Sequence, residues 1–106
     1  MDGGGLAVSN NDEVQTVWRR EGKIFSSIPG EPEKEIGEGK GCTLTTLNGK
    51  TFYAWTENGE VIVMNPGGKK IVPGRGGQPI VKALDNEKVI CVWENEKQIH
   101  ASVLEF

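Results

Sequence analysis

The chain is poor in the residues from which metal sites and disulfide frameworks are built. Its 106 residues include one histidine, His100, and two cysteines, Cys42 and Cys91. A zinc site normally takes three or four Cys, His or acidic ligands, and the spacing of these three residues does not provide such a set. The cysteines also lack the paired spacing of a disulfide framework. We interpret both as free, small apolar residues, and we expect no metal and no cofactor.

Charge of one sign and long apolar runs are also scarce. The net charge is −3 and the isoelectric point is near 5.2. Nucleic acid is therefore not an expected partner, because neutralising phosphates needs a basic stripe. No segment approaches the roughly 18 apolar residues of a membrane span, and residues 1–5 lack the basic and apolar regions of a signal peptide. We expect a soluble chain without a membrane partner, and nothing in the sequence indicates its compartment.

Helical periodicity is missing as well. No window of 11 or more residues keeps apolar residues at i, i+3 and i+4 without an interrupting glycine or proline. The 15 glycines, about twice the average share of roughly 7%, fall in clusters between short apolar runs. This distribution is typical of short strands joined by tight turns. The sequence therefore predicts an all-β protein.

One phrase occurs three times along the chain. It is a β-branched and aromatic run that ends in tryptophan, at residues 14–18, 51–55 and 89–93. The tryptophans Trp18, Trp55 and Trp93 are separated by 37 and 38 residues, and a second apolar run begins six residues after each. A fixed period of this size indicates a repeat architecture. A β-sandwich also suits many short strands, but its strands have no reason to recur at one period.

Each repeat reads as four antiparallel strands. Turn residues at 11–12, 48–49 and 86–87 join an inner strand to the tryptophan strand, and a second turn leads to a third strand. Short, charged outer strands are expected at 34–36 and 69–72, followed by glycine-rich linkers at 37–41 and 73–79. The predicted units are four-stranded antiparallel meanders at about 5–40 and 41–78, and a third at about 79–106 without its outer strand. Together they form one repeat domain over residues 1–106.

This pattern resembles the blades of sialidase-like and related six-bladed β-propellers. The resemblance runs from Gly5 to about Leu104 and rests on the glycine-rich opening, the second strand ending in tryptophan, and the Ile/Val-rich third strand. It implies a β-propeller fold with about three blades in this chain. The Asp-box of sialidases is absent. The Trp-Asp ending of WD40 blades is absent too, because Arg, Thr and Glu follow the three tryptophans.

The sequence predicts no catalytic residue and thus no enzyme. A sialidase-like site would need a tyrosine nucleophile and an arginine cluster, whereas the chain has one tyrosine and three arginines. Tyr53 stands where the other repeats have Thr16 and Cys91, which indicates a packing position. We interpret His100 as an ordinary strand residue. The three tryptophans are expected to be structural anchors buried against the neighbouring blade, and stacking on a sugar is the alternative.

A ligand surface, where one exists, is expected on the loops at one end of the strands, because loops on a rigid scaffold commonly carry function. These loops are residues 19–22, 56–59 and 94–97, together with the glycine-rich linkers. The candidate ligand residues on them are Arg19, Arg20, Glu57, Asn58, Arg75, Glu94 and Asn95. A glycan or a protein is the expected ligand.

Three blades do not close a ring, since propellers have about four to eight. We therefore expect a non-enzymatic binding or structural module that completes its ring by oligomerisation. A homodimer would have six blades, and a trimer with about nine is the second choice. The alternative function is a fragment of a larger sialidase-like glycoside hydrolase or a carbohydrate-binding lectin, with its active residues in further blades.

Overall fold

The computed structural model describes residues 4–8, 14–28, 30–84 and 88–105, and over these ranges the chain consists of β-strands and turns without a helix. The all-β prediction is confirmed. The turns predicted at 11–12 and 86–87 lie outside the described residues.

Three antiparallel sheets follow one another along the chain, and in each sheet the strands are neighbours in chain order. The first sheet contains β1 (Gly4–Val8), β2 (Val14–Arg20), β3 (Lys23–Ser27) and β4 (Lys34–Glu38). The second contains β5 (Lys40–Leu47), β6 (Lys50–Glu57), β7 (Glu60–Met64) and β8 (Lys70–Arg75). The third contains β9 (Gly77–Ala83), β10 (Lys88–Asn95) and β11 (Gln98–Glu105).

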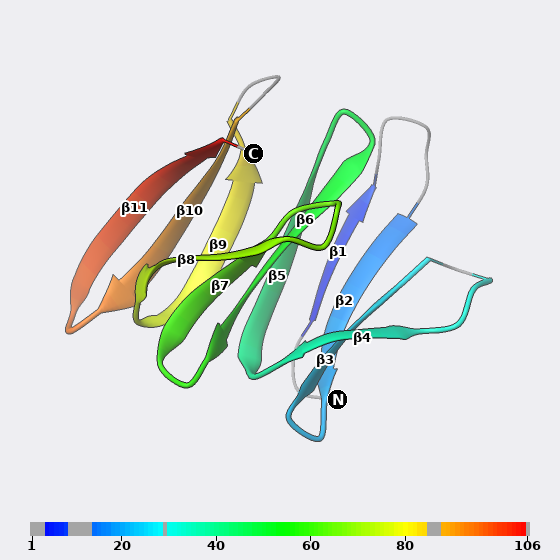
Figure 1. The fold of residues 1–106 in the computed structure, drawn as a ribbon, viewed down its shortest axis with the longest axis horizontal. Helices are drawn as coiled ribbons and strands as arrows, with labels where there is room; N and C mark the ends of the chain where they lie inside the picture. The colour runs from blue at the N-terminus through cyan, green and yellow to red at the C-terminus, as the bar shows by residue number, and fades with distance from the viewer. Residues whose placement is uncertain (1–3, 9–13, 29, 85–87, 106) are drawn as a thin grey trace.

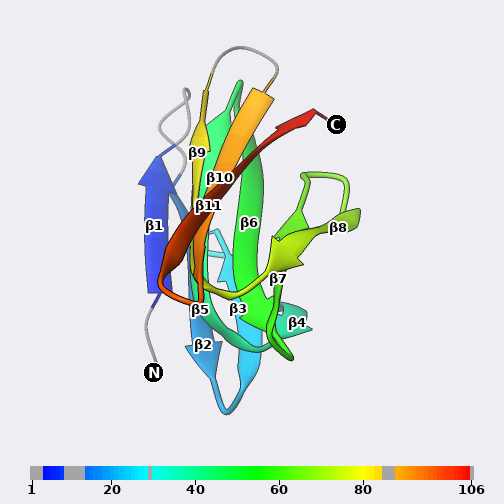
Figure 2. The same cartoon turned by 90° about the vertical axis from the view of Figure 1, so that its left-hand side faces the viewer.

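The sheets stand face to face in a row, with the second sheet in the middle (Figure 1). The first strands of the sheets, β1, β5 and β9, lie beside one another. In the view turned by 90°, β1 and β8 lie on opposite sides of the molecule (Figure 2). Each sheet therefore runs outward from a shared row of first strands.

The middle sheet is buried on both faces, which explains why β6 has a nearly continuous run of buried side chains. Successive strand residues point to opposite faces, so Tyr53 and Trp55 pack toward the first sheet while Phe52 and Ala54 pack toward the third. In β2 and β10, by contrast, buried positions alternate with more exposed ones. The two outer sheets thus bury only one face each.

Tight turns of the expected kind join the strands. Asn48 and Gly49 have φ values of 54° and 76°, and Asn58 and Gly59 have values of 53° and 78°. Two consecutive residues with positive φ are the mark of a type I′ hairpin turn, so these two predictions are confirmed. At the β10–β11 turn the same conformation is adopted without glycine, by Glu96-Lys97.

The glycine-rich linkers predicted at 37–41 and 73–79 are mostly wrong. Strands β4 and β8 extend to residues 38 and 75, so only Gly39 and Gly76 lie outside the strands. These two glycines have φ values of 135° and 138°, and a Cβ atom on them would lie 1.9 Å from the Thr56 carbonyl oxygen and 2.2 Å from that of Glu94. Glycine is required there for a close backbone approach, not for a long flexible connection.

Candidate functional site

Two of the three tryptophans are buried between sheets, each against a glycine of the preceding sheet. Trp55 is fully buried and Trp93 is 6% exposed. A Cβ atom on Gly37 of β4 would lie 2.5 Å from Trp55 Cζ2, and one on Gly74 of β8 would lie 2.5 Å from Trp93 Cζ2. Only a residue without a side chain leaves room for these indole rings. The structural role expected of the two tryptophans agrees with these contacts.

The two indole N–H groups are in different surroundings. Trp55 Nε1 donates to a carboxylate oxygen of Glu57 at 3.5 Å, and the backbone N–H of Glu38 reaches the same oxygen at 3.4 Å. Trp93 Nε1 is buried without a hydrogen-bond partner in the described ranges. Glu57, a predicted ligand residue, therefore accepts hydrogen bonds from both the first and the second sheet.

Trp18 differs from the other two tryptophans because no sheet of the described residues covers it. Its neighbour Val17 packs into the cluster between the first and second sheets, so Trp18 points to the opposite, outer face. There it is half-buried and stacks on Phe25 of β3, with ring centroids 6.2 Å apart. We call this outer face of the first sheet, marked by Trp18 and Phe25, the Trp18 face.

The outer face of the third sheet is apolar and exposed. Ile80, Ile99 and Val103 are 54%, 72% and 51% exposed, and they lie on the face opposite the buried Val89 and Cys91. We call this surface the Ile99 face. Ile99 lies six residues after Trp93, as Ile24 and Val61 lie six after their tryptophans, and those two are fully buried. Ile99 is exposed because, among the residues that the structure describes, no sheet lies against it.

The predicted ligand loops lie at one end of the strands, where the β2–β3, β6–β7 and β10–β11 turns meet the connections to β5 and β9 (Figure 1). The linkers are tied to these turns, since Gly39 N–H donates to Gly22 O at 2.8 Å and Gly76 N–H donates to Gly59 O at 2.9 Å. Asn58 and Glu94 are exposed there, and Asn95 is half-buried. We call this region the turn end.

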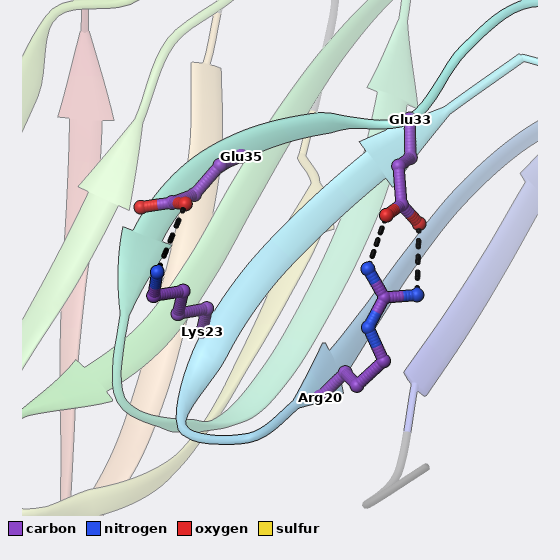
Figure 3. Close-up of polar contacts among 4 residues, drawn as sticks. All are labelled: Arg20, Lys23, Glu33 and Glu35. Carbon is purple, nitrogen blue, oxygen red and sulfur yellow. Dashed lines mark hydrogen bonds and ion pairs between the residues drawn. The ribbon is translucent and has the colours of Figure 1, made fainter.

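The three predicted arginines all make contacts within the chain. Arg19 Nε donates to Gly39 O at 2.7 Å, and Arg75 lies 3.8 Å from a Glu60 carboxylate oxygen. Arg20 pairs through both terminal nitrogens with Glu33, beside the Lys23–Glu35 ion pair at 3.7 Å (Figure 3).

The Arg20 guanidinium also lies 4.6 Å from the centre of the Phe25 ring. Hydrogen bonding to Glu33 raises the pKa of Arg20. The arginines thus make contacts within the first two sheets, while Arg20, Arg75, Asn58 and Glu94 stay exposed at the turn end.

A small cavity of about 340 Å³ lies at the turn end between the first and second sheets. Arg19, Asn58 and Lys40 line it. Thr56 also lines it, and the buried Thr56 hydroxyl has no hydrogen-bond partner in the part of the chain that the structure describes. The structure thus brings two of the seven predicted ligand residues, Arg19 and Asn58, to one cavity.

A larger cavity of about 520 Å³ lies between the same two sheets, toward the opposite end of the strands. Tyr53 lines it, is 8% exposed, and is hydrogen-bonded to the Ser26 hydroxyl. Burial raises the pKa of the Tyr53 phenol, which keeps it protonated and makes it a poor nucleophile. Tyr53, which the sequence predicts to be a packing residue, is buried and also forms part of the cavity wall.

Sequence reasoning missed this larger cavity, although a signal for it is present. Gln15 lies three residues before Trp18, where the other phrases have Phe52 and Ile90. Ser26 lies eight residues after Trp18, where the second phrase has Val63. Gln15 and Ser26 both line the cavity. Gln15 and Ser26 are polar where the second repeat has apolar residues, and this difference is the signal in the sequence for the cavity.

The remaining chemistry-bearing residues are in structural positions. Cys42 and Cys91 are free, and burial raises the pKa of the Cys91 thiol to about 11. His100 stacks on Trp93, with ring centroids 5.9 Å apart. Over the described ranges, no three His, Cys, Asp or Glu side chains are grouped so that they could hold a metal ion. The same ranges contain no helix with the length and apolar character needed to cross a membrane.

No family model matches the sequence, and no curated protein is similar to it.

Proposed function

We propose that the chain is a non-enzymatic β-propeller unit whose three sheets are blades, and that it serves as a binding or structural module by joining its two open faces to those of a second copy. The main support is that two residues at equivalent positions of the repeat, each six residues after a tryptophan, differ in exposure. Val61 is fully buried, whereas Ile99 is 72% exposed. Covering an apolar sheet face of this kind with a partner lowers the free energy, because apolar surface is removed from water.

The contact is head to tail. The Trp18 face and the Ile99 face are opposite ends of one row of sheets, so the Ile99 face of one copy meets the Trp18 face of the next. Such heterologous contacts form a ring when the rotation between copies closes. Two copies supply six sheets, within the four to eight blades of known propellers. A trimer with nine blades is the less favoured arrangement.

The ligand of such a ring is a glycan or a protein held at the turn end. Exposed Asn58 and Glu94 lie there, and Asn58 lines the smaller cavity between the first and second sheets. No catalytic role is assigned, because Tyr53 is buried and His100 is stacked on Trp93.

The alternative function is a fragment of a larger sialidase-like glycoside hydrolase or a lectin. The same two open faces favour it, since further blades of a longer chain would cover them equally well. A reading frame that continues through more 37-residue repeats would support this alternative.

Sedimentation equilibrium at micromolar concentration tests the proposal. Wild-type protein is expected at twice the 11.5 kDa chain mass. Ile99→Lys places a charge on the Ile99 face and should shift the protein to monomer. Gln98→Lys is the matched control, because Gln98 is exposed next to Ile99 in β11 but points to the opposite face of the sheet. A folded wild-type monomer would contradict self-assembly.

A further inference from the structure

The smaller cavity, at the turn end, carries positive charge. Its volume is about 340 Å³, and its wall includes the β2–β3 turn, the β6–β7 turn and the connection from β4 to β5. Arg19 and Lys40 line it, and none of the described residues on its wall is acidic. Pockets for small molecules measure about 300–1,000 Å³, so this one suits a small ligand. A wall of this composition attracts an anion.

Both cations belong to strands that the sheets hold in place. Arg19 Nε donates to Gly39 O at 2.7 Å, which fixes the guanidinium against the connection from β4 to β5. Lys40 is the cross-strand partner of Thr56 at the ends of β5 and β6, and the Cβ atoms of such partners are about 4.5–5.5 Å apart. Glu57 follows Thr56 in the chain, but its carboxylate accepts hydrogen bonds from an indole and a backbone N–H group. The cavity thus has its two charges on neighbouring elements, β2 and β5.

A buried hydroxyl group of a wall residue lacks a partner. Thr56 lines the cavity and is 6% exposed, and its Oγ1 atom has no hydrogen bond to any residue that the structure describes. Buried polar groups are normally hydrogen-bonded. A hydroxyl group can donate one hydrogen bond and accept others. An oxygen atom of a bound anion would accept the proton that Thr56 can donate.

The connection between the second and third sheets provides an internal comparison. It is tied to its neighbouring turn by the same backbone hydrogen bond, at 2.9 Å instead of 2.8 Å. Thr56 and Gly77 occupy there the positions that Arg19 and Lys40 occupy at the first connection. The second connection therefore forms without these two cations, so their charge is not a requirement of the fold.

The wall groups identify the class of anion. A guanidinium group binds phosphate oxygens through paired N–H donors, and lysine binds phosphate as a point charge. The Thr56 hydroxyl and the Asn58 amide add neutral donors. A phosphate monoester carries about 1.5–2 negative charges at pH 7, which two cations balance. We propose that the turn-end cavity binds a phosphate group, with Arg19, Lys40 and Thr56 as its main contacts. This site goes beyond the self-assembly proposed above, and it needs neither a second copy nor a closed ring.

Titration of the full chain with inorganic phosphate, followed by NMR of backbone amides, tests the site. The ionic strength is held constant with NaCl, because salt screens exposed charges. Phosphate should bind with a dissociation constant of about 1 mM and shift the amide signals of Gly39 and Thr56. Methyl phosphate is titrated in parallel. Tighter binding of inorganic phosphate identifies the free ion as the ligand, and tighter binding of methyl phosphate identifies a phosphate group carried by a larger molecule.

Single variants remove the ligand groups one at a time. Lys40→Met removes the charge and should weaken phosphate binding about tenfold. Lys50→Met makes the same change at an exposed position at the other end of the β5–β6 hairpin, and it should leave binding unchanged. Thr56→Val replaces the hydroxyl with a methyl group and should weaken binding about fivefold. Without phosphate, this variant should unfold at or above the wild-type temperature, because an unpartnered buried hydroxyl is removed.

The Arg19→Thr/Lys40→Gly variant reproduces the second connection and should abolish phosphate binding while the chain stays folded. Three outcomes would overturn the inference: no amide shifts up to about 20 mM phosphate, roughly 20 times the expected dissociation constant; acetate binding as tightly as phosphate; or wild-type affinity in Lys40→Met or Thr56→Val. Sedimentation of the same samples reports assembly independently, so a dimer that does not bind phosphate refutes the site and not the propeller unit.

Discussion

Replacement of Gly37 by alanine tests the contact that joins the first two sheets. The new Cβ atom would lie 2.5 Å from Trp55 Cζ2 and 2.9 Å from Cε2, whereas carbon atoms pack at about 3.5–4.0 Å. Trp55 is fully buried, and the Lys70 ammonium lies 5.4 Å from the centre of its ring, so the ring has no free space to move into. One side of the interface must shift by about 1 Å, the difference between those spacings.

Overpacking of this kind costs about 1–3 kcal/mol, and the lower entropy of the unfolded alanine chain returns about 0.4–1 kcal/mol. We expect Gly37→Ala to lower the free energy of unfolding by about 1–2 kcal/mol net of these two effects. The melting temperature should fall by roughly 5–15 °C. Thermal and urea unfolding followed by circular dichroism, at one fixed protein concentration, measure both quantities.

The controls isolate the clash from the effect of glycine replacement. Gly77→Ala adds a Cβ atom with nothing within 4 Å and should change the free energy of unfolding by less than about 0.5 kcal/mol. In a Trp55→Phe background, where Cζ2 is absent, the cost of Gly37→Ala should drop to a similar value. Equal costs for Gly37→Ala and Gly77→Ala in the wild-type background would show that Trp55 does not lie on Gly37.

Other perturbations of the chain also have defined outcomes. Trp55→Ala should cost about 3–5 kcal/mol of unfolding free energy, whereas Trp18→Ala should mainly weaken association, and a similar melting loss for both would contradict their different surroundings. Lys97→Gly should stabilise the chain by about 0.5–1 kcal/mol in urea unfolding, because Lys97 has a φ of 65°. Folding raises the pKa of Cys91 from an ordinary value of 9.0 to about 11, so the unfolded chain loses this proton first and stability falls as pH rises from 9 to 11. Relative to Cys91→Ala, wild-type protein should lose about 2–3 kcal/mol over that window, and parallel pH profiles would refute the burial of the thiol.

Alternation and turn chemistry account for what could be predicted of the fold. Short runs of leucine, threonine and aromatic residues on either side of Asn48-Gly49 predict a hairpin without any long-range information. Gly37 and Gly74 were misplaced into linkers because glycine in a cluster is typical of loops. Their strand position depends on an indole ring from the next sheet, which local sequence does not contain.

The candidate sites were predictable only in part, for a similar reason. Strand order predicts which end of the strands carries the turns. The intrachain contacts of Arg20 and Arg75 depend on acidic residues elsewhere in the chain, Glu33 in the β3–β4 connection and Glu60 in β7. Trp18 and Trp55 look equivalent in sequence, and their burial differs because only one has a neighbouring sheet. The larger cavity is formed by residues of two sheets, so it could not be predicted from the sequence around Gln15 alone.

Mixing two variants tests the head-to-tail contact most directly. Ile99→Lys disables the Ile99 face and Trp18→Lys disables the Trp18 face, so each variant alone should sediment as a monomer. An equimolar mixture keeps one intact contact, between the Trp18 face of the first variant and the Ile99 face of the second. We predict that dimers of mixed composition appear in sedimentation only after mixing. Two folded variants that stay monomeric when mixed, or an Ile99→Lys variant that dimerises alone, would contradict the head-to-tail arrangement.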